Sequence, residues 1–244
     1  MFDALKIRNK LVLLVAGPMA IILLLAAFGA KARLDTSAKS KDVERLTQLA
    51  QANSDVVAQL QQESLYSTAF VGSNRKQWKP DMTKARTATD QVLATTLEQQ
   101  RALADTSPAV RSAVALAVEA ADKLTYIRGA VDQGYQWDQV AATYEAVQST
   151  FLEVNDSIAG NLSDPKVAAD LRTGAALAGF KAQIAQQGSV LMGAAEEGGF
   201  PSEKAFGLFQ SAVTGAQTQL QILNSIADTE AKGAIRDALT NTSK

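Results

Sequence analysis

The residue types that most enzymes use for chemistry are scarce in this sequence. The chain has 244 residues and contains no histidine and no cysteine. This composition excludes an imidazole base, a thiolate nucleophile, a disulfide and a zinc site built from Cys and His. It also excludes a kinase core that carries phosphate on its own histidine. We therefore expect no catalytic residue, no metal ligand and no cofactor, and we predict that the chain is not an enzyme.

Two short polar clusters remain as candidates. Glu196 and Glu197 are adjacent and lie beside a glycine-rich turn, an arrangement more typical of a solvated helix end than of acid–base catalysis. Residues 75–79 combine three basic side chains with a tryptophan. Such a turn could contact a lipid headgroup or an anion, but the pattern is more typical of a solvated turn. Neither cluster predicts a reaction.

Charge is balanced overall but is distributed unevenly. Lys and Arg number 24 against 25 Asp and Glu. Residues 1–34 carry five basic groups and one acidic group, which leaves 19 basic and 24 acidic groups, a net of −5, in the remaining 210 residues. Nucleic-acid phosphates require a clustered basic face. The acidic body therefore predicts that no nucleic acid is bound.

A membrane anchor is predicted at residues 11–30. These 20 residues carry no charge and lie between Lys10 and Lys31. As a helix they would span about 30 Å, the thickness of a hydrocarbon core, and Pro18 is tolerable near the end of such a helix. The alternative is a cleaved signal peptide, whose apolar region usually has only about 7–15 residues. We expect a retained anchor in contact with membrane lipid.

The flanks of this segment suggest its orientation. Residues 1–10 carry three positive charges, which favours a cytoplasmic N-terminal flank. Residues 31–240 would then form an extracytoplasmic domain of a single-pass protein in the cell membrane. The absence of cysteine suits an oxidising exterior, although many cytoplasmic domains also lack it.

The body is predicted to be all-α. It is rich in helix-forming residues and has few runs of Val or Ile. Ser107-Pro108 and Asp164-Pro165 have the pattern of an N-cap followed by the first helical residue. Pro80 and Pro201 also lie beside capping residues, and Gly198-Gly199 should end a helix. The prolines and glycines predict helices at 36–73, 81–105, 108–132, 137–161, 165–197 and 202–227, and a weaker one at 229–240.

Helices of this length need neighbours, so we expect one or two stacked four-helix-type bundles of antiparallel helices. Two segments carry apolar stripes at 3–4 residue spacing, which predict core positions. The intervening polar residues, above all Glu63, must point inward and need partners. The stripes are Leu46, Leu49, Val56, Leu60 and Phe70 in the first helix, and Leu177, Phe180, Ile184, Gly188 and Leu191 in the fifth.

The sequence resembles the nitrate- and nitrite-sensing domain, an all-helical sensory module of bacterial signalling proteins, in the form found in actinobacterial membrane-bound sensor histidine kinases. The resemblance covers about residues 36–235 and the preceding anchor. It is carried by the order and spacing of short motifs rather than by any one of them. The matching residues are Leu60, Gln61 and Glu63, then Ser67, Phe70 and Gly72, then Arg86, Thr89 and Asp90, then Lys181, and finally Gly198-Gly199-Phe200.

The resemblance implies a ligand site, and this chain differs from the family at two positions of that site. In the family, two signature arginines help to hold the anion, and this chain has Ser64 and Gly188 at those positions. Two charge-assisted hydrogen bonds are worth roughly 3–6 kcal/mol, so their loss predicts some 10² to 10⁴-fold weaker binding of nitrate or nitrite. The candidate ligand-binding residues are Gln61, Glu63, Ser64, Arg86, Lys181, Gln187 and Gly188.

Two functions remain open from the sequence. The first is a membrane-anchored sensory input domain of a two-component or related signal-transduction system, in which a small polar ligand shifts helix packing. The second is an anchored helical scaffold that binds a partner and senses no small molecule. A homodimer is expected by analogy with membrane sensors, and a separate signalling partner would supply the output.

Overall fold

The computed structural model describes residues 41–101, 107–162, 164–229 and 232–233. It shows an all-helical protein over these residues, with no strand among them. The predicted anchor at 11–30 lies outside the described residues, as do the first residues of the helix predicted at 36–73 and most of the one predicted at 229–240. Within the described part, no helix is both long and apolar enough to cross a membrane.

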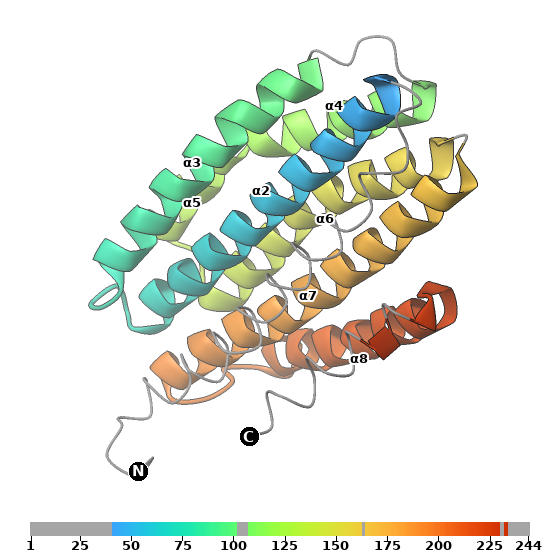
Figure 1. Ribbon diagram of the computed structural model, residues 1–244. Coiled ribbons are helices and arrows are strands. Elements are labelled where there is room, and N and C mark those ends of the chain that lie inside the picture. The colour runs from blue at the N-terminus through green and yellow to red at the C-terminus, as the bar shows by residue number, and fades with distance from the viewer. Residues whose placement is uncertain (1–40, 102–106, 163, 230–231, 234–244) are drawn as a thin grey trace, which may run out of the picture.

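Seven described helices follow one another along the chain, and Figure 1 labels them α2 to α8. Five of them match the predicted helices closely, whereas the helix predicted at 108–132 is interrupted at Lys123. Its buried stripe nevertheless continues across the interruption, from Val110 on one side to Val131 on the other. The helices are α2 (Lys41–Gly72), α3 (Lys79–Arg101), α4 (Pro108–Asp122), α5 (Leu124–Gln133), α6 (Trp137–Asn161), α7 (Pro165–Glu197) and α8 (Glu203–Ile226).

The helix ends follow the capping rules that the sequence indicated. Ser107 accepts a hydrogen bond from the Val110 amide, and Asp164 accepts from the two amides that follow Pro165. Ser202 caps α8 in the same way. Gly198 ends α7 in the left-handed region with φ 94°, a conformation that glycine adopts without steric cost. The helix predicted to begin at residue 81, after Pro80, begins two residues earlier, at Lys79.

The helices lie side by side, with α2 near the centre (Figure 1). Helix α2 packs against α3, α6 and α7, while α8 packs almost entirely on α7. The last turn of α2 meets the last turn of α7 at Gly72 and Gly193, so these two helices run parallel. The described helices therefore share one layered arrangement, and two bundles stacked end to end, which the sequence also allowed, are not seen.

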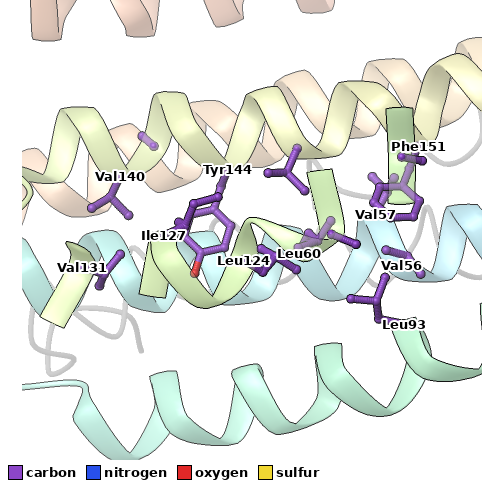
Figure 2. Packing of buried hydrophobic residues seen from close by; sticks show 14 of the residues in the cluster. Val56, Val57, Leu60, Leu93, Leu124, Ile127, Val131, Val140, Tyr144 and Phe151 are labelled. Atoms are coloured by element: carbon purple, nitrogen blue, oxygen red, sulfur yellow. The ribbon is translucent and has the colours of Figure 1, made fainter. Parts of the chain in front are cut away.

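The core lies between α2 and α6. Helix α6 contributes Trp137, Tyr144 and Phe151, all fully buried, and α2 contributes Val56 and Leu60. Figure 2 shows α5 placing Leu124, Ile127 and Val131 in the same cluster. This confirms the apolar stripe predicted for the first long helix, of which only Leu46 is partly exposed.

The stripe predicted for α7 is not the core face of that helix. Leu177, Phe180, Ile184 and Leu191 are only half-buried. The buried face of α7 instead presents small side chains such as Ala182, Ala185 and Ser189. Small residues allow the backbone of α7 to lie close to its neighbours, and this displaces the larger side chains to the edge of the interface. The spacing of apolar residues identified the helix, but it did not show that the face with the smaller residues, rather than the face with the larger ones, packs against the core.

Polar side chains in the core are paired near the start of α2. Asn53 donates to Asn155 Oδ1 of α6 at 3.2 Å and accepts from Gln100 Nε2 of α3 at 2.9 Å. Asn155 in turn donates to Ser54 at 3.1 Å. These bonds tie α2, α3 and α6 together and help to fix their register, although the Gln100 carbonyl oxygen is buried without a partner among the described protein atoms. Asn53, predicted to need an internal partner, has two of them.

Candidate functional site

Glu63 is the centre of a buried polar cluster. Its carboxylate is fully buried, and it accepts two hydrogen bonds from Arg128, from Nε at 2.7 Å and from Nη2 at 3.0 Å. The hydroxyl of Tyr144 donates to the same carboxylate at 2.7 Å, and Ser67 lies 3.5 Å from that hydroxyl. The cluster joins α2 to α5 and α6. A fully buried carboxylate is tolerated only with such partners.

Arg128 extends the cluster to α3, because its Nη1 lies 2.7 Å from Asp90 Oδ1. Burial alone would lower the pKa of Arg128, but hydrogen bonds and the charges of Glu63 and Asp90 outweigh burial and raise it. Burial is also the main reason why the pKa of Tyr144 is raised, with the Glu63 charge adding to the effect. Arg128 is therefore a fixed cation that two carboxylates already neutralise.

Arg86, one of the candidate ligand-binding residues, is held elsewhere. Both of its terminal nitrogens lie 3.0 Å from the carboxylate of Asp132 in α5. One of them also lies 3.4 Å from the Arg128 carbonyl oxygen. The guanidinium thus ties α3 to α5, so gripping a small anion between α2 and α7 would require it to leave a carboxylate. Its Nε is buried and has no partner among the residues that the structure describes.

Gln61 and Ser64, one turn apart on α2, form the second polar feature. Gln61 is 2% exposed and Ser64 is 1% exposed. Both amide atoms of Gln61 and the hydroxyl of Ser64 are buried without a hydrogen-bond partner among the described protein atoms. An unsatisfied buried polar group costs about 1–3 kcal/mol. We call these two residues, with the facing turn of α7, the α2–α7 seam.

The position of the seam follows from the close contact of the two parallel helices. A Cβ atom placed on Gly72 would lie 2.6 Å from the Gly193 carbonyl oxygen. Three buried residues precede Gly72 by 11, 8 and 4 positions, namely Gln61, Ser64 and Thr68. These spacings place them on the same side of α2 as Gly72. The facing part of α7 lies the same distance before Gly193. The seam is therefore packed between two backbones that approach closely.

The remaining candidates lie around this seam but do not all face it. Lys181 is half-buried on α7, and burial lowers its pKa, partly offset by the charge of Asp55. Gln187 turns toward α8, where its Nε2 donates to the Ala212 carbonyl oxygen at 3.3 Å. Gly188 is buried within α7. The structure thus places Gln61 and Ser64 together and assigns Glu63 and Arg86 to the separate cluster around Arg128.

The two clusters singled out by residue type alone have structural partners. Arg75 donates to the carbonyl oxygens of Val131 and Tyr135, at 3.2 and 2.9 Å, and so fastens the turn after α2 to the end of α5. The indole of Trp137 donates to the carboxylate of Glu197. Each contact explains its charged residue as a tie between helix ends.

Sequence reasoning missed the main partners of Glu63. Arg128 and Tyr144 lie 65 and 81 residues away along the chain, and neither belongs to a motif. The one available signal was the need of a buried carboxylate for a cation. That need does not say which of the basic residues supplies it, because the answer depends on how α5 packs.

The described helices define an all-α bundle with a buried polar seam, and comparison with known proteins identifies its family. Residues 55–244, more than half of the chain, match the family described as nitrate and nitrite sensing. The chain belongs to this family, which confirms the resemblance found in the sequence.

A solved structure shares the fold. The chain is similar to a structure titled "Structure of the NasR transcription antiterminator", with a TM-score of 0.71 and 17% sequence identity. The match covers 77% of this chain and 52% of that one, so this chain spans about half the length of the NasR structure. At this identity the likeness shows the fold alone. No curated protein matches the chain.

Proposed function

We propose that the chain is a sensory input domain of a bacterial signal-transduction system, anchored in the cell membrane by residues 11–30 with its body outside. In this proposal a small polar ligand binds at the α2–α7 seam and changes how the two helices pack. The chain itself carries no catalysis, and a separate signalling partner reads the change. Family membership and the all-helical fold support the sensory role.

The observation that carries the proposal is the state of Gln61 and Ser64. Their side chains are almost fully buried, yet three of their polar atoms have no partner among the described protein atoms. A binding site with buried, unpaired donors and acceptors gains hydrogen bonds when a ligand supplies the missing partners. Ser64 is also a position at which the family resemblance implies a ligand-binding residue.

The same residues argue for weak binding of nitrate. The guanidiniums of Arg86 and Arg128 are engaged with carboxylates, and the seam itself offers an amide and a hydroxyl. Nitrate accepts hydrogen bonds but donates none, so it would leave the Gln61 carbonyl oxygen unsatisfied. A molecule with both a donor and an acceptor would suit the carboxamide better.

Helix α2 offers a direct route for the signal. It begins at Lys41, eleven residues after the end of the predicted anchor, and it packs against α3, α6 and α7. A ligand that changes the distance between α2 and α7 would therefore move α2, which is the first described helix after the predicted anchor. Movement of a packed helix by 1–2 Å is a common form of such switching.

The test is ligand-dependent thermal unfolding of the full chain in a mild detergent. The probes are nitrate, nitrite and acetamide, which has both a donor and an acceptor, with chloride as the control. Binding at 100 times Kd stabilises a protein by about 2.7 kcal/mol. We expect at least one probe to raise the unfolding midpoint of the wild type and not that of Gln61→Leu. If no probe does so, the scaffold alternative is favoured.

A further inference from the structure

The exposed face of α8 has an unusual composition. From Ala205 to Ala227 the chain contains no charged residue, and the two charges of the helix, Glu203 and Lys204, lie in its first turn. Every other described helix has charged residues beyond its first turn. Exposed surfaces normally carry many charged side chains. The exposed side of α8 therefore differs from the rest of the described surface.

Amide and hydroxyl side chains make up most of this face. Gln210, Thr214, Gln217 and Gln221 are all exposed and recur at 3–4 residue spacing, which places them along one side of the helix. We call this side of the helix the α8 face. Phe206 and Ile222, which are 44% and 40% exposed, lie at its two opposite edges, near the two ends of the helix. The face itself consists of polar groups that are not ionised.

The α8 face has no neighbour within the described chain. Helix α8 packs almost entirely on α7 and lies at the edge of the molecule in Figure 1. Its contact with α7 is close, because Gln219 covers Gly179 and Gln183 covers Gly215. This close packing holds α8 firmly on the bundle while its opposite side remains open.

Helix α3 provides an internal comparison. It is also an edge helix, packed chiefly on α2. Its exposed residues include Asp81, Lys84, Asp90 and Glu98, as expected of a face in contact with water. Interface cores, by contrast, are depleted in charged residues. The difference between two edge helices of the same chain indicates that the α8 face is covered and the α3 face is not.

We infer that the α8 face is a self-association surface on which a second copy of this chain packs, α8 against α8, about a two-fold axis. Two features favour a second copy. The part of the chain after residue 34 has a net charge of −5, so two copies repel one another except where they meet through uncharged surface. Carboxamides and hydroxyls also donate and accept at once, so such a face is complementary to itself.

Single cysteines test this arrangement cleanly because the natural chain has none. Gln217→Cys places a thiol near the middle of the α8 face, and Thr87→Cys places one at an exposed position on α3 as the matched control. Each full-length variant is oxidised in mild detergent at the same concentration, and the disulfide-linked dimer is quantified on a denaturing gel. Because both positions are exposed, both variants should fold, which far-UV circular dichroism verifies.

We expect Gln217→Cys to form the linked dimer and Thr87→Cys to form little. Adding Thr214→Glu and Gln221→Glu to the Gln217→Cys chain should lower the yield about tenfold, since like charges that face each other across an interface are strongly unfavourable. Adding Thr214→Ser instead should leave the yield unchanged. Equal linkage at positions 217 and 87, or linkage insensitive to the added carboxylates, would overturn the inference. Sedimentation of the wild type as a single chain would do the same.

Discussion

Arg128 holds Glu63 through two hydrogen bonds, at 2.7 and 3.0 Å, although the carboxylate is fully buried and the two residues lie on different helices. With Asp90 on the far side of the guanidinium, this pairing connects α2, α3 and α5. It also means that the cation paired with Glu63 is already neutralised. The stability of the bundle depends on this arrangement, and so does the ligand preference that we propose for the α2–α7 seam.

Replacing Arg128 with methionine should be strongly destabilising. The substitution retains an unbranched apolar stem and leaves Glu63 buried without its cation, which typically costs about 3–5 kcal/mol. Urea unfolding followed by circular dichroism measures the loss. Lys123→Met is the control, because it removes an ion pair with Glu119 whose side chains are 63% and 62% exposed, and such pairs contribute at most about 1 kcal/mol. Equal effects of the two variants would contradict this role for Arg128.

Gly193 should not tolerate a methyl group. A Cβ atom there would lie 2.7 Å from the indole ring of Trp137, which is fully buried. Overpacking of this kind typically costs about 1–3 kcal/mol. Gly174 lies on the same helix, with open space around its Cα, so Gly174→Ala should stabilise by about 0.5–1 kcal/mol through helix propensity. Thermal unfolding of both variants compares them directly, and a Gly193→Ala protein as stable as wild type would rule out the close contact.

Gln61→Leu should stabilise the protein when no ligand is added. The leucine removes two buried amide atoms that have no protein partner, and such a group costs about 1–3 kcal/mol. Urea unfolding provides the measurement. Gln100→Leu is the informative control. Its Oε1 is also buried without a partner, but its Nε2 donates to Asn53 at 2.9 Å, so this substitution breaks a bond and should leave the protein less stable than Gln61→Leu does. A less stable Gln61→Leu protein would show that the amide is satisfied in the free protein and would weaken the case for a ligand.

The pH dependence of stability should reveal Glu145. Burial raises the pKa of this α6 carboxyl, so the folded state binds the proton more tightly than the unfolded state does. The group therefore favours folding while it is protonated and loses that contribution as the pH rises through its folded-state pKa. Glu145→Gln should be more stable than wild type near pH 7, and the difference should disappear near pH 4. A difference that persists at the lower pH would point to packing rather than ionisation.

The sequence predicted the helices well because their boundaries depend on local chemistry. Ser107, Asp164 and Gly198 act within one turn of their own helix, so a cap can be recognised without knowledge of the fold. The need of Glu63 for an internal partner was also predictable, since its place on an apolar stripe requires one.

The choice of partners was not predictable, because it depends on which helices meet. Arg128 reaches Glu63 only because α5 packs beside α2. Arg86 of α3 binds Asp132 because that residue also lies on α5. The covered face of α7 was likewise assigned to its larger residues, whereas close approach of α2 selects the smaller ones. Contacts between residues that are distant in the chain set the site, and periodicity within one helix does not encode them.

Calorimetric titration of the full chain with nitrate is the most direct test of the central claim, which is that the α2–α7 seam lacks a free guanidinium and binds nitrate weakly. Two missing charge-assisted hydrogen bonds should weaken binding by some 10² to 10⁴-fold. We therefore expect no saturable heat at micromolar nitrate, and a response at millimolar concentration no larger than that of chloride. Saturable micromolar binding of nitrate that Ser64→Ala reduces would contradict the claim.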